Sequence, residues 1–244
     1  MTNPFLAQSR VSQPRNLRKT APRGRFARGL YLLTPDLTDT AALLAQVTPL
    51  LAHVQLLQYR NKAANAALRE QQARALVPMC RAAGVPLIIN DDIALAARIG
   101  ADGVHLGEND DGVVQARAAL GADGIIGASC YNDLARARYA ASQGADYIAF
   151  GAFFATTSKP TALRADPQLL RDAVELGLPL VAIGGITPGN APTLIAAGAQ
   201  LLAVISGVFD AKEPTAAAYA YAALFDQDTT DCAPSSMLGV PYSS

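Results

Sequence analysis

The sequence of 244 residues contains no tryptophan, only two histidines and only three cysteines. Cys80, Cys130 and Cys232 are odd in number, lie far apart and form no CxxC pair. This usage excludes a disulfide framework and a cysteine zinc site, and it indicates a reducing compartment. No apolar run reaches the roughly 20 residues that a membrane-spanning helix needs. We therefore expect a cytoplasmic protein with no membrane partner.

The formal net charge is zero, but the charges are unevenly distributed along the chain. Residues 1–35 carry seven basic residues and no acidic one, so that the remainder, with 13 basic and 20 acidic residues, has a net charge of −7. An acidic body offers no basic face to nucleic acid. The basic segment 1–28 lacks the apolar core of a secretory signal. Its composition resembles a transit peptide, although we favour a disordered extension there and a disordered tail over residues 226–244.

Short apolar runs alternate with helical patterns between these two ends. Uninterrupted apolar strands separated by helices are typical of a parallel sheet that is covered on both faces. The expected strands are residues 29–34, 54–59, 86–89, 103–106, 124–128, 147–150, 179–183 and 201–205. The expected helices are residues 39–52, 66–83, 93–99, 112–120, 133–143, 168–176, 190–197 and 215–225.

Eight strand–helix units that close on themselves predict an α/β protein with one (β/α)8 TIM barrel over residues 29–225. An open doubly wound sheet is the alternative, but no GxGxxG follows the first strand. Asp166 and Thr187 each precede a proline, which predicts a capped helix start at both places. Pro49 and Pro78 fall inside expected helices and should kink them.

Two neighbouring expected strands each end in an acidic cluster, NDD at residues 90–92 and ENDD at residues 108–111. Adjacent parallel strands lie about 4.8 Å apart, so the two clusters should meet at one rim. Carboxylates placed in this way can share a hard cation such as Mg²⁺. Asp92 and Asp111 could instead cap the helices that follow. We expect one aspartate of each pair to be a cap and the other, Asp91 or Asp110, to bind the metal.

Cations and hydroxyls follow other strands of the expected barrel. Gln58, Arg60 and Lys62 alternate along an extended segment and should point together, where two cations suit a diphosphate or triphosphate. A surface loop can also hold such cations without a role. Ser129 follows the fifth strand.

The loop after the sixth strand is long, rich in hydroxyls and ends in Lys159, a composition suited to a flexible phosphate-binding flap. An ordinary solvated loop is the alternative, although Phe153 and Phe154 favour a segment that covers something. Gly184 and Gly185 follow the seventh strand, at a place where barrels often present backbone N–H groups to a phosphate. The sequence thus predicts one cationic, metal-assisted anion site and one cradle of amides and hydroxyls.

Residues suited to acid–base catalysis are scarce. His53 lies at the exit of the first expected helix and is interpreted as structural. His105 lies inside a strand, which favours an imidazole held in the barrel interior over a catalyst. We find no Ser-His-Asp set and no lysine placed for a Schiff base. A reaction driven by departure of pyrophosphate would need cations and a pocket for the second reactant rather than a protein base.

The polar motifs, in this order at the strand ends, resemble the thiamine phosphate synthase family over about residues 28–210. They are QxRxK at 58–62, NDD at 90–92, GVHLGxxD at 103–110, GxS at 127–129, FGxxFxTxxK at 150–159, IGGI at 183–186 and VIS at 204–206. The resemblance implies a transferase that joins 4-amino-2-methyl-5-hydroxymethylpyrimidine diphosphate to thiazole phosphate. It also implies a dissociative, Mg²⁺-assisted mechanism that yields thiamine monophosphate and pyrophosphate.

The resemblance also implies roles for individual residues. The diphosphate would be held by Arg60, Lys62, Asn90, Ser129 and Lys159, and all of these except Asn90 form the expected catalytic set. Gln58 would also bind substrate. Asp91 and Asp110 would ligate Mg²⁺. The thiazole phosphate would be held by Thr156, Ser158 and the backbone near Gly185, Ile205 and Ser206.

Four positions depart from the family pattern, namely Glu108, Ala152, Ser158 and Tyr131. Tyr131 stands where a thiazole tautomerase-like paralogue uses histidine, which argues against that alternative. A non-catalytic phosphate-binding barrel should have lost Asp91, Asp110 or Lys159, and an epimerase should show an acid/base pair, which we do not find. The expected partners are therefore small phosphorylated molecules, and a homo-oligomer stays open.

Overall fold

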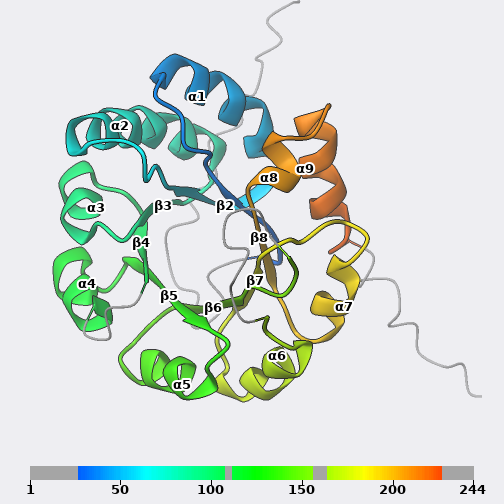
Figure 1. Cartoon of the computed structure of the whole chain (residues 1–244). Coiled ribbons are helices and arrows are strands. Elements are labelled where there is room, and N and C mark those ends of the chain that lie inside the picture. Colours follow the sequence, from blue (N-terminus) through cyan, green and yellow to red (C-terminus); the bar gives the residue numbers. More distant parts are fainter. Residues whose placement is uncertain (1–26, 108–111, 156–163, 227–244) are drawn as a thin grey trace, which may run out of the picture.

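Eight parallel strands form a closed barrel in the computed structural model of the chain, which describes residues 27–107, 112–155 and 164–226. The strands follow one another in sequence order, and β1 pairs with β8 to close the sheet. Helices surround the strands as an outer ring (Figure 1). The prediction of a (β/α)8 barrel is confirmed.

The strand bounds lie within a few residues of the predicted ones. The strands are β1 Gly29–Leu33, β2 Val54–Tyr59, β3 Leu87–Asn90, β4 Gly103–Leu106, β5 Ile125–Tyr131, β6 Tyr147–Gly151, β7 Leu180–Ile183 and β8 Leu201–Val204. The α-helices are α1 Thr40–Val47, α2 Ala66–Ala83, α3 Ile93–Ile99, α4 Gly112–Leu120, α5 Leu134–Ser142, α6 Pro167–Ala173, α7 Ala191–Ala196, α8 Ser206–Phe209 and α9 Pro214–Ala223. Two 3-10 turns, η1 Thr48–His53 and η2 Val174–Leu176, extend α1 and α6.

Strand residues alternate between two apolar layers, because successive side chains on a strand point to opposite faces. Leu30 and Leu32 of β1 join the layer between strands and helices, whereas Tyr31 and Leu33 join the cluster inside the barrel. The same alternation places every second residue of the other strands inside. Polar residues at interior positions near the strand ends are therefore held at the top of a packed core.

Several helix starts follow from a single acidic or amide side chain. Asp39, Asn65, Asp92, Asp133 and Asp166 each accept hydrogen bonds from backbone N–H groups in the first turn of the next helix. Each cap satisfies a donor that the helix itself cannot pair. The predictions for Asp92 and Asp166 are confirmed.

Other details differ from the prediction in part. Thr187 caps the turn at residues 188–190 that leads into α7: its hydroxyl accepts the Asn190 N–H over 3.3 Å, and its own N–H donates to Asn190 Oδ1 over 2.8 Å. The predicted capping at Thr187 is therefore confirmed, although α7 itself begins at Ala191. Helix α8, directly after β8, was not predicted, since four residues are too few for a periodic pattern. The expected helix 39–52 divides at Thr48, because Pro49 lacks the N–H that an α-helix would use there.

The N-terminal end of the barrel is held by an arginine between two strand–helix units. Arg117 of α4 donates to the carbonyl oxygens of Gly124 at 2.6 Å and Gly144 at 3.1 Å, and to the Asp146 carboxylate at 2.7 Å. Asp146 in turn accepts the N–H of Ile126 over 2.8 Å. These contacts lie far from the strand ends that carry the predicted site.

None of the helices that the structure describes is long and apolar enough to cross a bilayer. Most of the predicted N-terminal extension and of the predicted tail falls on residues 1–26 and 227–244, outside the described ranges.

Candidate functional site

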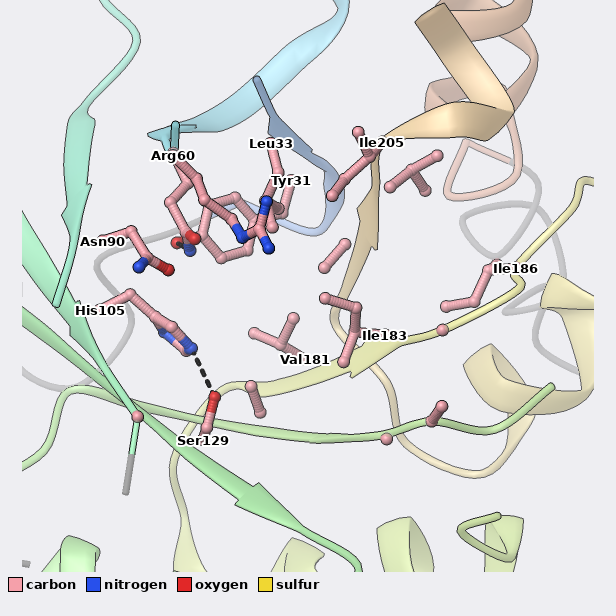
Figure 2. A pocket seen from close by; sticks show the side chains of 18 of the residues that line it. Tyr31, Leu33, Arg60, Asn90, His105, Ser129, Val181, Ile183, Ile186 and Ile205 are labelled. Carbon is pink, nitrogen blue, oxygen red and sulfur yellow. Dashed lines mark hydrogen bonds between the residues drawn. The ribbon is translucent and has the colours of Figure 1, made fainter. Parts of the chain in front are cut away.

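A cavity of about 310 Å³ opens at the C-terminal ends of the strands. Every strand, or the segment that follows it, contributes to its wall. This is the face of a (β/α)8 barrel on which catalytic residues are placed, whereas the opposite end serves stability. Figure 2 shows Arg60, Asn90, His105 and Ser129 on one side of this cavity, with Val181, Ile183, Ile186 and Ile205 across from them. One wall is therefore polar and the facing wall is apolar.

The cavity brings together most of the residues predicted to form the site. Those that line it are Gln58, Arg60, Lys62, Asn90, Asp91, Ser129, Gly185, Ile205 and Ser206. The remaining predicted residues, Asp110, Thr156, Ser158 and Lys159, lie outside the described residues, as does Glu108. Their predicted roles stay predictions.

The cationic part of the wall is held by residues that follow β1. The Thr34 hydroxyl accepts the N–H of Arg60 and donates to its carbonyl oxygen, both over 2.9 Å. Asp36 Oδ1 lies 3.4 Å from Arg60 Nη1 and accepts the Lys62 N–H over 3.0 Å. The Arg60 side chain is 24% exposed. These contacts hold the Arg60–Lys62 segment in an extended path, so that both cations border the cavity as alternation predicted.

Asp91 and Asp92 are adjacent but do different things. Asp92 Oδ1 accepts the Leu95 N–H over 2.8 Å as the cap of α3. Asp91 has a left-handed backbone conformation with φ of 59°, which turns its side chain toward the cavity. Its two oxygens accept hydrogen bonds from the Gly107 N–H at 2.9 Å and the Asn90 amide at 2.8 Å. The expectation that Asp92 would be the cap is confirmed.

The Asp91 carboxylate suits a hard cation. Each of its oxygens accepts one hydrogen bond from the contacts above, which leaves lone pairs on an exposed anionic group at the cavity wall. Mg²⁺ commonly binds through one or two carboxylates and completes its shell with water and substrate phosphates. The described ranges contain no cluster of three or more histidine, cysteine, aspartate or glutamate residues able to hold a metal ion. Asp91 therefore fits as one ligand of a site that takes its other oxygens from elsewhere.

A hydrogen-bonded series of five polar side chains crosses the barrel interior, and all of them except Tyr147 line the cavity. Gln58 Nε2 donates to the Tyr31 hydroxyl over 2.7 Å, and that hydroxyl lies 2.7 Å from the Tyr147 hydroxyl. The Tyr147 hydroxyl lies 3.0 Å from His105 Nδ1, and His105 Nε2 lies 2.8 Å from Ser129 Oγ. The last contact is drawn in Figure 2. Gln58, which we predicted to bind substrate, is thus also part of an internal network.

Burial keeps the titratable members of this chain uncharged. Desolvation lowers the pKa of His105 to about 4, against a smaller opposing effect of the Asp91 charge, so that the imidazole is neutral near pH 7. Desolvation also raises the pKa of Tyr31 and Tyr147 well above the usual value of a tyrosine. The expectation that His105 is an interior, hydrogen-bonded imidazole is confirmed.

The glycines after β7 are required by packing as well as by any ligand. Gly184 and Gly185 have φ of 103° and 61°, and a Cβ on Gly185 would lie 2.2 Å from the Ala155 carbonyl oxygen. The segment after β6 crosses directly over them, and the Phe154 N–H donates to the Gly184 oxygen over 3.0 Å. The prediction from sequence considered only their exposed amides.

Helix α9 reaches the same loop. The Tyr221 hydroxyl donates to the Ile186 carbonyl over 2.8 Å, and a Cβ on Gly207 would lie 2.3 Å from that hydroxyl. The absence of a side chain at Gly207 in α8 therefore gives the Tyr221 hydroxyl room to reach the loop that follows β7. Both Ile186 and Gly207 line the cavity, so this bond helps to shape its apolar wall.

Sequence reasoning missed Tyr31, Tyr147, Asp36 and Tyr221. The two interior tyrosines read as ordinary apolar strand residues, and only their positions in the closed barrel bring their hydroxyls together. Their interior-facing positions in the strands were the signal available. Asp36 and Tyr221 gave no comparable signal.

Comparison with known proteins gives a consistent result. The sequence model of the family described as thiamine monophosphate synthase matches residues 30–208. The chain is 62% identical over 206 residues to thiamine-phosphate synthase of Xanthomonas campestris pv. campestris (strain 8004), covering 84% of this chain and 100% of that protein. It is 56% identical over 199 residues to thiamine-phosphate synthase of Xylella fastidiosa (strain Temecula1), covering 82% and 85% of the two chains.

Solved structures show the same relationship. Thiamine phosphate pyrophosphorylase from Pyrococcus furiosus superposes with a TM-score of 0.71 at 28% identity, covering 84% of this chain and 98% of that one. A 3-hexulose-6-phosphate synthase superposes with a TM-score of 0.61 at 18% identity, covering 80% and 99%, and at that identity the likeness concerns the fold alone.

Proposed function

The chain belongs to the thiamine monophosphate synthase family and is a transferase, and from this premise we propose which reaction it runs and with which residues. The substrates are 4-amino-2-methyl-5-hydroxymethylpyrimidine diphosphate and thiazole phosphate. The products are thiamine monophosphate and pyrophosphate. The pairing of a polar wall with an apolar wall in one small cavity at the strand ends supports this proposal best.

The polar wall suits a diphosphate that leaves with its bonding electrons. Arg60 presents a guanidinium that can donate to two phosphate oxygens, and Lys62 adds a second cation beside it. Asn90 and Ser129 are neutral groups on the same wall. Charge placed where negative charge develops lowers the barrier to departure, and more so in a cavity that excludes water. We assign these residues to the diphosphate, with Lys159 as a further cation from the loop after β6.

Mg²⁺ is the cofactor that we propose, held by Asp91 and Asp110. When bound, the ion supplies positive charge to the diphosphate oxygens and so makes pyrophosphate a better leaving group. The Asn90 amide and the Gly107 N–H orient the Asp91 carboxylate. Groups that hold a ligand carboxylate in this manner are commonly needed for metal affinity.

The apolar wall suits the two rings. Once the diphosphate has left, the aminopyrimidine delocalises the positive charge on its methylene carbon, and the thiazole nitrogen captures that carbon. Val181, Ile183 and Ile186 offer apolar contact that holds rings in place without reacting with the cation. The thiazole phosphate is assigned to Thr156, Ser158 and the backbone near Gly185, Ile205 and Ser206.

The tautomerase alternative is less well supported. Tyr131, at the position where that paralogue uses histidine, lies with its ring centroid 5.6 Å from the Arg136 guanidinium carbon. A tyrosine under a guanidinium is a poor replacement for an imidazole that shuttles protons near pH 7.

The proposal is tested by mixing the purified protein with both phosphorylated substrates and Mg²⁺ and measuring pyrophosphate and thiamine monophosphate together. We expect the two products in equal amounts, with loss of both when a chelator is added and recovery when Mg²⁺ is restored. Absence of thiamine monophosphate with Mg²⁺ in excess would contradict the proposed reaction. Turnover unaffected by the chelator would contradict only the proposal that Mg²⁺ is the cofactor, not the proposed reaction.

A further inference from the structure

We propose that Tyr147 is a positioning residue that acts through His105 to make the Ser129 hydroxyl a hydrogen-bond donor toward the cavity. The inference rests on the proposed function in one respect, namely that the acceptor is an oxygen of the diphosphate. It extends that function by assigning a role to Tyr147, which is buried and does not line the cavity.

Gln58 determines the donor-to-acceptor direction of these hydrogen bonds. An amide nitrogen can only donate, so the Tyr31 oxygen accepts at the 2.7 Å contact with Gln58 Nε2. The proton of Tyr31 is then available for the Tyr147 oxygen, also 2.7 Å away. Both hydroxyls belong to fully buried side chains, where an unsatisfied donor or acceptor costs about 1–3 kcal/mol.

The same direction continues through the imidazole. Since Tyr147 accepts from Tyr31, its own proton points to His105 Nδ1 over 3.0 Å. A neutral imidazole whose Nδ1 accepts carries its proton on Nε2. That Nε2–H donates to Ser129 Oγ over 2.8 Å.

Ser129 is the last residue in this series of hydrogen bonds, and it faces the cavity. Its oxygen accepts from His105, so its own proton is left for a group inside the cavity. If the hydrogen bonds ran in the opposite direction, His105 Nε2 would accept and the Ser129 proton would point to the imidazole ring. The lone pairs of the Ser129 oxygen would then face the ligand. An anionic oxygen is attracted by the first arrangement and repelled by the second. A donor oriented before the ligand arrives needs no reorganisation as negative charge develops.

Packing holds the rings of this hydrogen-bonded network in place. The His105 ring stacks on the Tyr147 ring at an interplanar angle of 15°, and the Tyr31 ring meets Tyr147 edge-on at 88°. A Cβ on Gly127 would lie 1.9 Å from Tyr147 Cζ, so the glycine of the GxS motif makes room for this ring. Arg136 Nε donates to the Ser129 carbonyl over 3.2 Å and holds its backbone.

A double-mutant cycle tests whether Tyr147 acts through Ser129. We expect Ser129→Ala to lower kcat by about 100-fold, the loss typical of one preorganised donor. Tyr147→Phe should lower kcat about 10-fold in the wild-type background and less than about 2-fold in the Ser129→Ala background, because residues of one network are not additive. Equal losses in both backgrounds would overturn the proposal.

A matched variant separates this effect from a general loss of stability. Tyr59 is also buried and donates to Gln72 over 2.8 Å, but it does not line the cavity. Tyr59→Phe should lower the melting temperature much as Tyr147→Phe does, while kcat changes less than about 2-fold. A comparable loss of kcat in both variants would show that Tyr147 serves only the fold.

The tautomer of His105 gives a readout that needs neither substrates nor variants that fold poorly. In ¹⁵N-labelled wild-type protein near pH 7 we expect an unprotonated Nδ1 and a protonated Nε2. Assignment is direct, because His53 is the other histidine in the sequence and can be removed as His53→Gln. A proton on Nδ1 would overturn the proposal whether or not the protein turns over, whereas failed turnover with the expected tautomer would contradict only the proposed function.

Discussion

Asp91 and Asp92 are neighbours in sequence with different tasks, and their backbone decides which task each performs. The left-handed conformation of Asp91 directs its carboxylate to the cavity, while Asp92 is left to cap α3. Aspartate and asparagine tolerate this conformation better than most residues. The two carboxylates can therefore be separated by experiment.

The first prediction concerns this pair. Asparagine at position 91 tolerates the same backbone conformation and keeps an oxygen for the Gly107 N–H, but it removes the negative charge. In Asp91→Asn, pyrophosphate release should therefore fall by about 100-fold or more. The free energy of unfolding should change by less than about 0.5 kcal/mol. Asp92→Ala should lose about 1 kcal/mol of stability as a lost cap and retain kcat. Steady-state kinetics and urea unfolding of both variants measure this. The reverse pattern would contradict the assignment of the two aspartates.

Gly127 is the second residue whose role can be tested alone. A methyl group there would collide with the Tyr147 ring, so Gly127→Ala should destabilise the protein by about 1–3 kcal/mol, as overpacking does. Gly189→Ala is the matched control, because its nearest atom would be Thr187 Oγ1 at 3.8 Å. Chemical denaturation of both variants tests the prediction. Equal stability of the two would mean that Tyr147 moves aside without cost.

The two ends of the barrel differ in what their side chains do. At the C-terminal ends of the strands Arg60, Asp91 and Ser129 border a cavity. At the other end Arg117 of α4 is occupied by the backbone before β5 and by Asp146 before β6. The barrel therefore carries cavity-lining polar residues at one end and stabilising contacts at the other, as is general for this fold.

A third prediction follows for the N-terminal end. Arg117→Met keeps part of the side-chain volume but removes the hydrogen-bond donors, so that Asp146 loses this partner. We expect the free energy of unfolding to fall by about 2 kcal/mol, with kcat unchanged. Arg138→Met is the control, because the Arg138–Glu175 pair is exposed, at 59% and 58%, and contributes little. Thermal unfolding and steady-state kinetics measure both effects. A lower kcat in folded Arg117→Met would show coupling between the two ends.

The proposed binding of a diphosphate in the cavity should stabilise the whole molecule, because a ligand that binds only the folded state shifts the unfolding equilibrium. Pyrophosphate with Mg²⁺ at about 100 times its Kd should add about 2.7 kcal/mol, which corresponds to about 5–10 °C in melting temperature for a chain of this size. Calorimetry or dye-based melting measures the shift. Without ligand, Arg60→Ala should melt at the wild-type temperature, and the ligand should raise its melting temperature only slightly. A rise equal to that of the wild type would contradict the assignment of Arg60 to the site.

Much of the architecture was predictable because its causes are local. The helices 66–83, 93–99 and 112–120 and the strands 54–59 and 103–106 were predicted with the bounds that the structure has. Apolar runs, capping aspartates and glycines at helix ends are short-range signals. The cap at Thr187 is such a signal too, since its partner Asn190 is three residues away. Helix α8 was missed because four residues carry no period.

The rim residues were predictable for a related reason. Parallel strands that close into a barrel send all of their C-terminal ends to one side, so Arg60, Asn90, Asp91 and Ser129 had to meet there once the strands were identified. Their exact partners were not predictable. Asp36 beside Arg60 and Tyr221 beneath Ile186 come from segments that sequence patterns do not connect.

The barrel, its functional face and most of the residues around the cavity follow from the amino-acid pattern, because periodicity and strand direction are properties of the local backbone. Which interior side chains touch depends on how the strands close on one another. Tyr31 and Tyr147 are 116 residues apart and become hydrogen-bonded because the closed sheet places β1 and β6 across one narrow interior. The orientation of the polar chain that ends at Ser129 depends on that closure, and no spacing along the sequence encodes it.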